Sequence, residues 1–155
     1  MRRALIGLAV VAGLALTWTA QGATGRVVKV LPEFLDLKGF NSVSPSLYER
    51  DAYQAVLRQH PEKRSGLRFY IQWKTKGGVW EPLKLRLELR GIAQGSLPKR
   101  LVLEEPIETT GRGGSHWAGI TLKGQAFKDF GEVTAWRVTL WEGDQLLSQQ
   151  QSFLW

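Results

Sequence analysis

Residues 83–90 read LKLRLELR, four leucines that alternate with four charged side chains. Successive side chains of a β-strand point to opposite faces, so the leucines share one face and the charged groups share the other. The stretch therefore predicts a strand with one buried face and one face in water. The alternating positions are Leu83, Leu85, Leu87 and Leu89 against Lys84, Arg86, Glu88 and Arg90.

The same two-residue period recurs on both sides of this strand, between stretches rich in glycine and proline. Short alternating strands separated by turn signals are typical of an antiparallel sandwich. The predicted fold class is therefore mostly β, a seven-strand antiparallel sandwich with one inserted helix between strands 1 and 2. The predicted strands are residues 26–31, 66–74, 83–90, 99–105, 116–122, 133–141 and 145–155.

The inserted helix is predicted at about residues 46–59. The sequence offers two possible N-caps for this helix. Ser44 could cap it with Pro45 as the first helical residue, or Ser46 could cap it with Glu49 three residues later. The helix should end before Pro61, because the residue preceding a proline avoids the α region. Its apolar stripe is thin, so we expect it to pack on another element. That stripe consists of Leu47, Ala52, Ala55 and Val56.

Residues 1–22 have the three parts of a secretory signal peptide: a basic start, a short apolar stretch and small residues before the cut. Cleavage is expected after Gly22, since Ala20 and Gly22 place small side chains at the −3 and −1 positions; a cut after Ala23 fits less well. The apolar stretch is shorter than the roughly 20 residues that span a bilayer. We therefore expect a signal peptide at 1–22 and a single β-sandwich domain at 23–155. The mature chain should have no transmembrane segment and should be periplasmic or extracellular.

The composition narrows the possible chemistry. The chain has no cysteine, which excludes disulfides, thiol catalysis and thiolate metal sites. Residues 23–155 hold 19 Lys and Arg against 14 Asp and Glu, a net charge of +5. The basic residues alternate along strands and form no continuous basic block. Together with export, this pattern makes nucleic acid an unexpected partner.

Two of the predicted strands resemble those of fibronectin type III modules. Leu67-x-Phe69-x-Ile71-x-Trp73 is similar to their core tryptophan strand, and Trp136-x-Val138-x-Leu140 is similar to their penultimate strand. The resemblance spans roughly residues 66–155 and is one of pattern. It departs in the inserted helix, in Trp136 where a tyrosine is usual, and in the lack of immunoglobulin-type cysteines. It implies an immunoglobulin-like sandwich with an adhesive, spacing or accessory role and no catalytic residue.

Candidate catalytic groups are few. His60 lies at a helix end, where the helix dipole favours a cation. Ser115 and His116 are adjacent on a predicted strand, so their side chains should point to opposite faces, whereas a hydrolase needs groups that converge. Two separated histidines do not form a zinc site. We therefore expect no catalytic residue, no metal and no cofactor.

The tryptophans are the strongest binding candidates. Trp117 and Trp141 fall on the outward register of their strands, and Trp80 lies in a turn. With Arg137 they could form a stacking platform for a sugar ring or a protein partner. The alternative, which we favour, is that the inserted helix lies across that outer face and covers Trp117 and Trp141.

These patterns favour a non-enzymatic envelope or secreted module that binds another envelope or secreted protein through an outer sheet face or an edge strand. The alternative is a carbohydrate-binding module that uses Trp80, Trp117 and Trp141. A periplasmic hydrolase built around His116 is the weakest of the three hypotheses.

Overall fold

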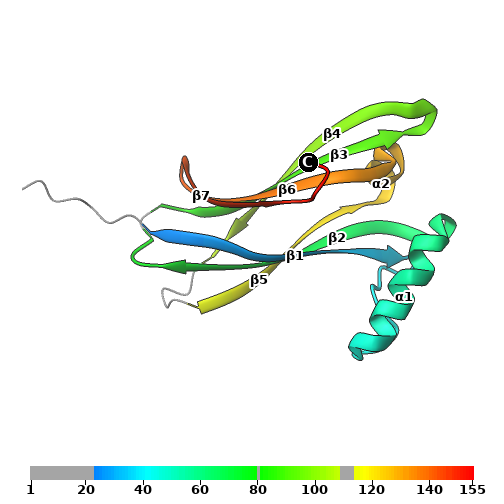
Figure 1. Cartoon of the computed structure of the whole chain (residues 1–155), viewed down its shortest axis with the longest axis horizontal. Coiled ribbons are helices and arrows are strands. Elements are labelled where there is room, and N and C mark those ends of the chain that lie inside the picture. Colours follow the sequence, from blue (N-terminus) through cyan, green and yellow to red (C-terminus); the bar gives the residue numbers. More distant parts are fainter. Residues whose placement is uncertain (1–22, 80, 109–113) are drawn as a thin grey trace, which may run out of the picture.

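The computed structural model describes residues 23–79, 81–108 and 114–155, which form two antiparallel sheets packed face to face (Figure 1). One sheet has the order β1-β2-β5 and the other β4-β3-β6-β7. The strands are β1 (Thr24–Asp36), β2 (Arg64–Lys76), β3 (Leu83–Ala93), β4 (Leu97–Ile107), β5 (Gly114–Lys123), β6 (Glu132–Glu142) and β7 (Gln145–Gln151). The helices are α1 (Leu47–Gln59) and α2 (Gly124–Phe130), with 3-10 turns at Pro61–Lys63 and Gln94–Ser96.

The predicted fold class is confirmed: the described chain is mostly β, with seven antiparallel strands in two sheets and a helix between strands 1 and 2. This architecture is consistent with an immunoglobulin-like fold. No helix within the described ranges is long and apolar enough to cross a membrane. The signal peptide predicted at 1–22 and Trp80 lie outside the described residues.

The core lies between the sheets and begins with the leucines of residues 83–90. All four are at most 3% exposed. On the neighbouring strand β6, three apolar residues pair in register with leucines of β3: Trp136 with Leu89, Val138 with Leu87, and Leu140 with Leu85. The facing sheet supplies Phe69, Ile71 and Trp73 from β2, each at most 2% exposed. The Phe69 and Trp136 rings meet edge to face at 6.3 Å and so join the two sheets.

Strand β1 is longer than predicted and continues through Pro32 to Asp36. It is the edge strand of its sheet, and Pro32 pairs in register with Phe69 of β2. Proline is tolerated on an edge strand when its nitrogen faces the unpaired side. The predicted end of this strand at residue 31 was therefore wrong.

Residues 124–130, which lie between two predicted strands and for which no helix was predicted, form the short helix α2. Phe130 is buried and Phe127 packs against the core. Gly131 ends the helix with a φ of +79°, and a Cβ there would lie 2.3 Å from the Ile92 carbonyl oxygen. Only glycine fits this close approach of α2 to the end of β3.

The inserted helix is confirmed, and Ser46 is its cap: the Ser46 hydroxyl accepts from the Glu49 N–H at 3.5 Å. The predicted apolar stripe was wrong. Its members are partly or largely exposed, whereas Gln54 and Leu57 are buried. A hydrogen-bonded side chain, Gln54, therefore holds much of the helix in place.

Gln54 binds the free edge of β1 in the way that a neighbouring strand would. Its Oε1 accepts from the Phe34 N–H at 2.8 Å, and its Nε2 donates to the Phe34 carbonyl at 2.9 Å. The same Nε2 donates to the Asn41 carbonyl at 2.7 Å. These bonds satisfy edge groups of β1 that would otherwise lie buried beneath α1.

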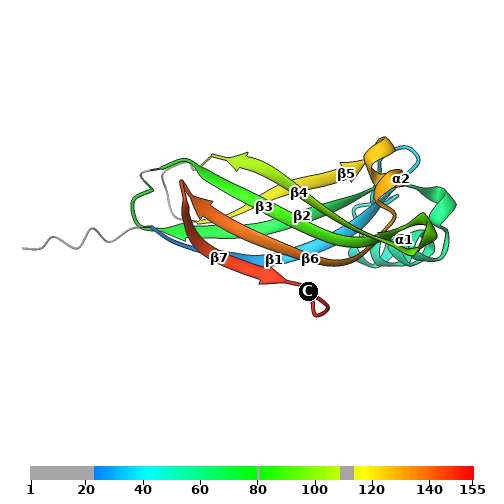
Figure 2. The same ribbon diagram turned by 90° about the horizontal axis from the view of Figure 1, so that it is seen from above.

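The helix does not cover the predicted tryptophans, so that part of the prediction was wrong. Helix α1 packs against β1 at one end of its sheet (Figures 1 and 2). Trp117 on β5 is 54% exposed, and Trp141 belongs to β6 of the other sheet. The helix lies at the β1 edge because Gln54 binds there.

We expect Leu87→Ala to lower the free energy of unfolding by about 2–5 kcal/mol, because it removes a fully buried side chain and leaves a cavity. Urea denaturation followed by tryptophan fluorescence measures the change. Val102→Ala on β4, whose side chain is about half exposed, is the control and should cost much less. Equal losses would contradict the assignment of the core.

Gln54→Ala should lower the free energy of unfolding by about 1–3 kcal/mol, because it leaves the Phe34 backbone groups without partners beneath α1. Gln59→Ala, at the exposed end of the same helix, is the matched control and should change it by less than about 0.5 kcal/mol. Hydrogen exchange should show faster exchange in Gln54→Ala at the Phe34 amide. Unchanged exchange there would refute this anchoring role.

Candidate functional site

Arg137 and Trp141 lie together on the outer face of β6, where both are engaged within the protein. Arg137 forms an ion pair with Glu88 of β3. The Trp155 ring lies against the guanidinium groups of Arg90 and Arg137, at 4.1 and 4.7 Å from its centroid. The Trp141 indole N–H donates to the Thr139 hydroxyl at 2.8 Å. Trp155 and this network therefore occupy much of the predicted binding face.

Trp117 lies on the outer face of the other sheet. It pairs in register with Gln72 of β2, and its neighbours Ala118 and His116 point the opposite way, toward the interior side. Trp117 and Trp141 thus face away from each other across the sandwich and do not form one platform. The structure brings Arg137 and Trp141 together and separates Trp117 from both.

Ser115 and His116 also face opposite sides of β5. The Ser115 hydroxyl accepts from Gln72 Nε2 at 2.8 Å on the outer face. The His116 ring stacks on the buried Trp73 ring, with centroids 4.8 Å apart. The two groups therefore do not converge on one reacting atom. In the part of the chain that the structure describes, no three His, Cys, Asp or Glu side chains come close enough to share a metal ion.

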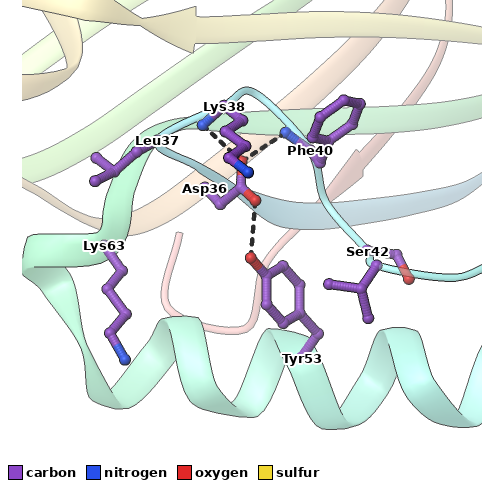
Figure 3. A pocket seen from close by; sticks show the side chains of 8 residues that line it. Asp36, Leu37, Lys38, Phe40, Ser42, Tyr53 and Lys63 are labelled. Carbon is purple, nitrogen blue, oxygen red and sulfur yellow. Dashed lines mark hydrogen bonds between the residues drawn. The ribbon is translucent and has the colours of Figure 1, made fainter.

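A hollow lies between α1 and the loop that precedes it, where no binding site was predicted from the sequence (Figure 3). Its volume is about 510 Å³. We call it the helix–loop groove and define it by Asp36, Leu37, Lys38, Phe40, Ser42, Val43, Tyr53 and Lys63. Three of these side chains are apolar and 59–72% exposed: Leu37, Phe40 and Val43.

Asp36 at the end of β1 organises the loop side of this groove. Its Oδ1 accepts from the N–H groups of Lys38 and Phe40 at 2.8 and 2.9 Å, and its Oδ2 accepts from the Tyr53 hydroxyl at 2.8 Å (Figure 3). Backbone bonds between Asp36 and Phe40 and between Gly39 and Asp36 close the turn. One carboxylate therefore ties the strand, the loop and α1 together.

These hydrogen bonds determine the protonation states of Asp36 and Tyr53. Burial acts to raise the pKa of Asp36, but the hydrogen bonds from Phe40, Tyr53 and Lys38 outweigh it and hold the pKa below its usual value. The hydrogen bond to the Asp36 carboxylate raises the pKa of Tyr53. Asp36 is therefore ionised and Tyr53 protonated at neutral pH. Lys38 and Lys63 add two positive charges to the lining of the groove, against the one negative charge of Asp36.

Contiguous exposed apolar side chains mark interaction surfaces on soluble proteins. Leu47 and Tyr48, in the first turn of α1, are also largely exposed and lie next in the chain after the loop. The sequence did contain a signal for this surface. Leu37, Phe40 and Val43 are apolar residues in a predicted loop, and no strand or helix face accounts for them.

Comparisons with known proteins support the fold alone. No family model matches the sequence, and no curated protein matches it. A crystal structure from Akkermansia muciniphila is similar, with a TM-score of 0.56 and 14% sequence identity. The similarity covers 84% of this chain and 70% of that one.

Asp36→Asn should weaken the dependence of stability on pH. A carboxyl whose pKa is lowered by folding stabilises the protein above its unfolded pKa, and that contribution is lost as the pH falls through the folded pKa. The wild type should therefore lose more stability than Asp36→Asn between neutral pH and about pH 3. Urea midpoints across this range measure the difference.

Tyr53→Phe provides the graded comparison, since it removes one of the bonds to Asp36 and keeps the carboxyl. It should give a pH dependence between those of the wild type and Asp36→Asn. If all three proteins lost stability in parallel, Asp36 would have no such role.

Proposed function

We propose that residues 23–155 form a non-enzymatic interaction module of the cell envelope or the secreted space, and that the helix–loop groove binds its protein partner. The observation that carries this proposal is the gathering of Leu37, Phe40 and Val43, all largely exposed, around a hollow of about 510 Å³. Such a hollow lies within the size range of binding pockets. The signal peptide pattern at 1–22 supports the location.

The order of the strands supports a module of the fibronectin type III kind, in which the β1-β2-β5 sheet faces a β4-β3-β6-β7 sheet. By analogy of fold, modules of this kind commonly bind other proteins. The inserted helix, foreign to that family, forms one wall of the groove. It would therefore give this module a recognition surface of its own.

The side chains that line the groove indicate what kind of partner segment it would bind. Apolar side chains supply the area that a partner would bury, and Lys38 and Lys63 supply positive charge at the rim. We therefore propose a partner segment with one or two apolar anchors flanked by acidic residues. The bonds of Asp36 hold the loop in place, so binding would require little further ordering of it.

The test uses protein expressed from the full-length sequence and purified after export. A photo-crosslinking residue at Phe40 would capture the partner in intact cells, and titration with the purified partner would then give affinities. Phe40→Ser should weaken binding by about tenfold or more, as truncation of a central anchor does. Trp117→Ala, on the outer face of β5, is the matched control and should bind as the wild type does.

Two results would overturn this proposal. If Trp117→Ala abolished binding while Phe40→Ser did not, the outer face of β5 would be the recognition surface. If envelope or plant polysaccharides changed the tryptophan fluorescence and Trp117→Ala removed that change, the carbohydrate-binding alternative would replace a protein partner.

A further inference from the structure

A second hollow is lined by residues of both sheets and of both helices. Figures 1 and 2 show that α1 and α2 lie at the same end of the sandwich. Its volume is about 410 Å³. We call it the inter-sheet cavity. Its apolar walls come from both sheets and from α2: Phe34, Leu67, Phe69, Phe127, Val133 and Trp136.

The cavity exists because the second sheet ends early on this side. The first half of β1 contacts β7, and the Val27 N–H donates to the Ser148 hydroxyl at 3.0 Å. Strand β7 ends at Gln151. The next residue, Ser152, makes two hydrogen bonds to the Trp136 backbone: its hydroxyl accepts from the Trp136 N–H, and its own N–H donates to the Trp136 carbonyl. The second half of β1, from Pro32 onward, therefore extends past the end of β7, and the interior is open beside it.

The cavity reaches the core. Phe69 is fully buried and Leu67 is 4% exposed, yet both line it. The edge-to-face contact of Phe69 with Trp136 forms part of its inner wall. An apolar group that entered would therefore lie against side chains otherwise sealed from water, which is the most favourable place for it.

The mouth of the cavity is basic. Arg64 is fixed there: its guanidinium donates to the Leu57 and Arg58 carbonyls at the end of α1 and lies 4.1 Å from the centroid of the Phe34 ring. Glu132 lines the cavity and Glu62 lines the hollow that adjoins it, and both carboxylates attract Arg64.

Two further cations lie near the same opening. Arg58 lines both the cavity and the hollow that adjoins it, and Lys128 of α2 lines the latter. Within residues 23–79, 81–108 and 114–155, neither side chain forms an ion pair. Positive charge is therefore available to a ligand at the point where the apolar interior meets water.

We propose that the inter-sheet cavity binds a small amphiphile, with its apolar chain against Leu67, Phe69 and Trp136 and a single anionic group at Arg58 and Lys128. An apolar pocket of 300–1,000 Å³ with a few polar groups at one end is typical of such ligand sites. Fatty acids are the simplest members of this class. The inter-sheet cavity shares no lining residue with the helix–loop groove, and the proposal goes beyond the proposed function.

The test measures binding of laurate, dodecanol and dodecyltrimethylammonium to the purified protein by calorimetry, below their micellar concentrations. Laurate should bind saturably at one site per chain. Dodecanol should bind several-fold more weakly, and the cationic amphiphile more weakly still. In the NMR spectrum, laurate should shift the indole resonance of Trp136 and leave those of Trp117 and Trp141 in place.

Three variants locate the site. Val133→Trp, which fills the cavity, should reduce laurate affinity at least about tenfold. The double change Arg58→Glu and Lys128→Glu should reduce laurate affinity about tenfold and leave dodecanol binding nearly unchanged. Phe40→Ser, in the helix–loop groove, should bind laurate as the wild type does, which separates this site from the proposed protein-binding surface.

The proposal is overturned if no ligand binds saturably, or if laurate shifts Trp117 or Trp141 and not Trp136. Equal affinities for laurate and dodecanol would overturn the anionic class of the ligand. If Val133→Trp did not fold, the Trp136 resonance of the wild type and the charge-reversal variant would still decide the question.

Discussion

The burial of one apolar face from each sheet is the interaction on which the rest of this structure depends. The leucines of β3 and the Phe69, Ile71 and Trp73 side chains of β2 are almost fully removed from water. Each such side chain contributes roughly 1.5–3 kcal/mol when buried. Because side chains alternate along a strand, burying this face commits the opposite face to the surface, which is why the charges of β3 lie outside.

Those outer charges form a network that limits what the outer face can bind. Arg86 and Arg137 share Glu88, and Lys84 and Arg86 share Glu104. Trp155 adds its ring between Arg90 and Arg137. Exposed ion pairs of this kind contribute little stability individually. Together they occupy side chains that would otherwise be available to a ligand, and this argues against the second sheet as the main recognition face.

The end of the sandwich near α1 and α2 differs from the rest of the surface. Gln54 attaches α1 to the edge of β1 by hydrogen bonds, so most of the apolar side chains of the helix stay exposed. Beside the helix, the Asp36 carboxylate holds the loop that carries Phe40. On the other side of β1, the early end of β7 leaves the interior open. Both hollows therefore result from how β1 ends and from what is attached to it.

The sequence by itself determined the two layers, the strand count and the presence of one helix, because alternation and turn residues are local signals that the core then enforces. It also determined that Ser115 and His116 point apart. It did not determine which helix face is buried, since Gln54 binds backbone groups of a strand about 20 residues away in the chain. Nor could it show that Trp117 and Trp141 lie on opposite sides, because alternation defines the face of each strand and not the sheet to which the strand belongs. Both hollows depend on where strands end in space, and only the tertiary structure decided that.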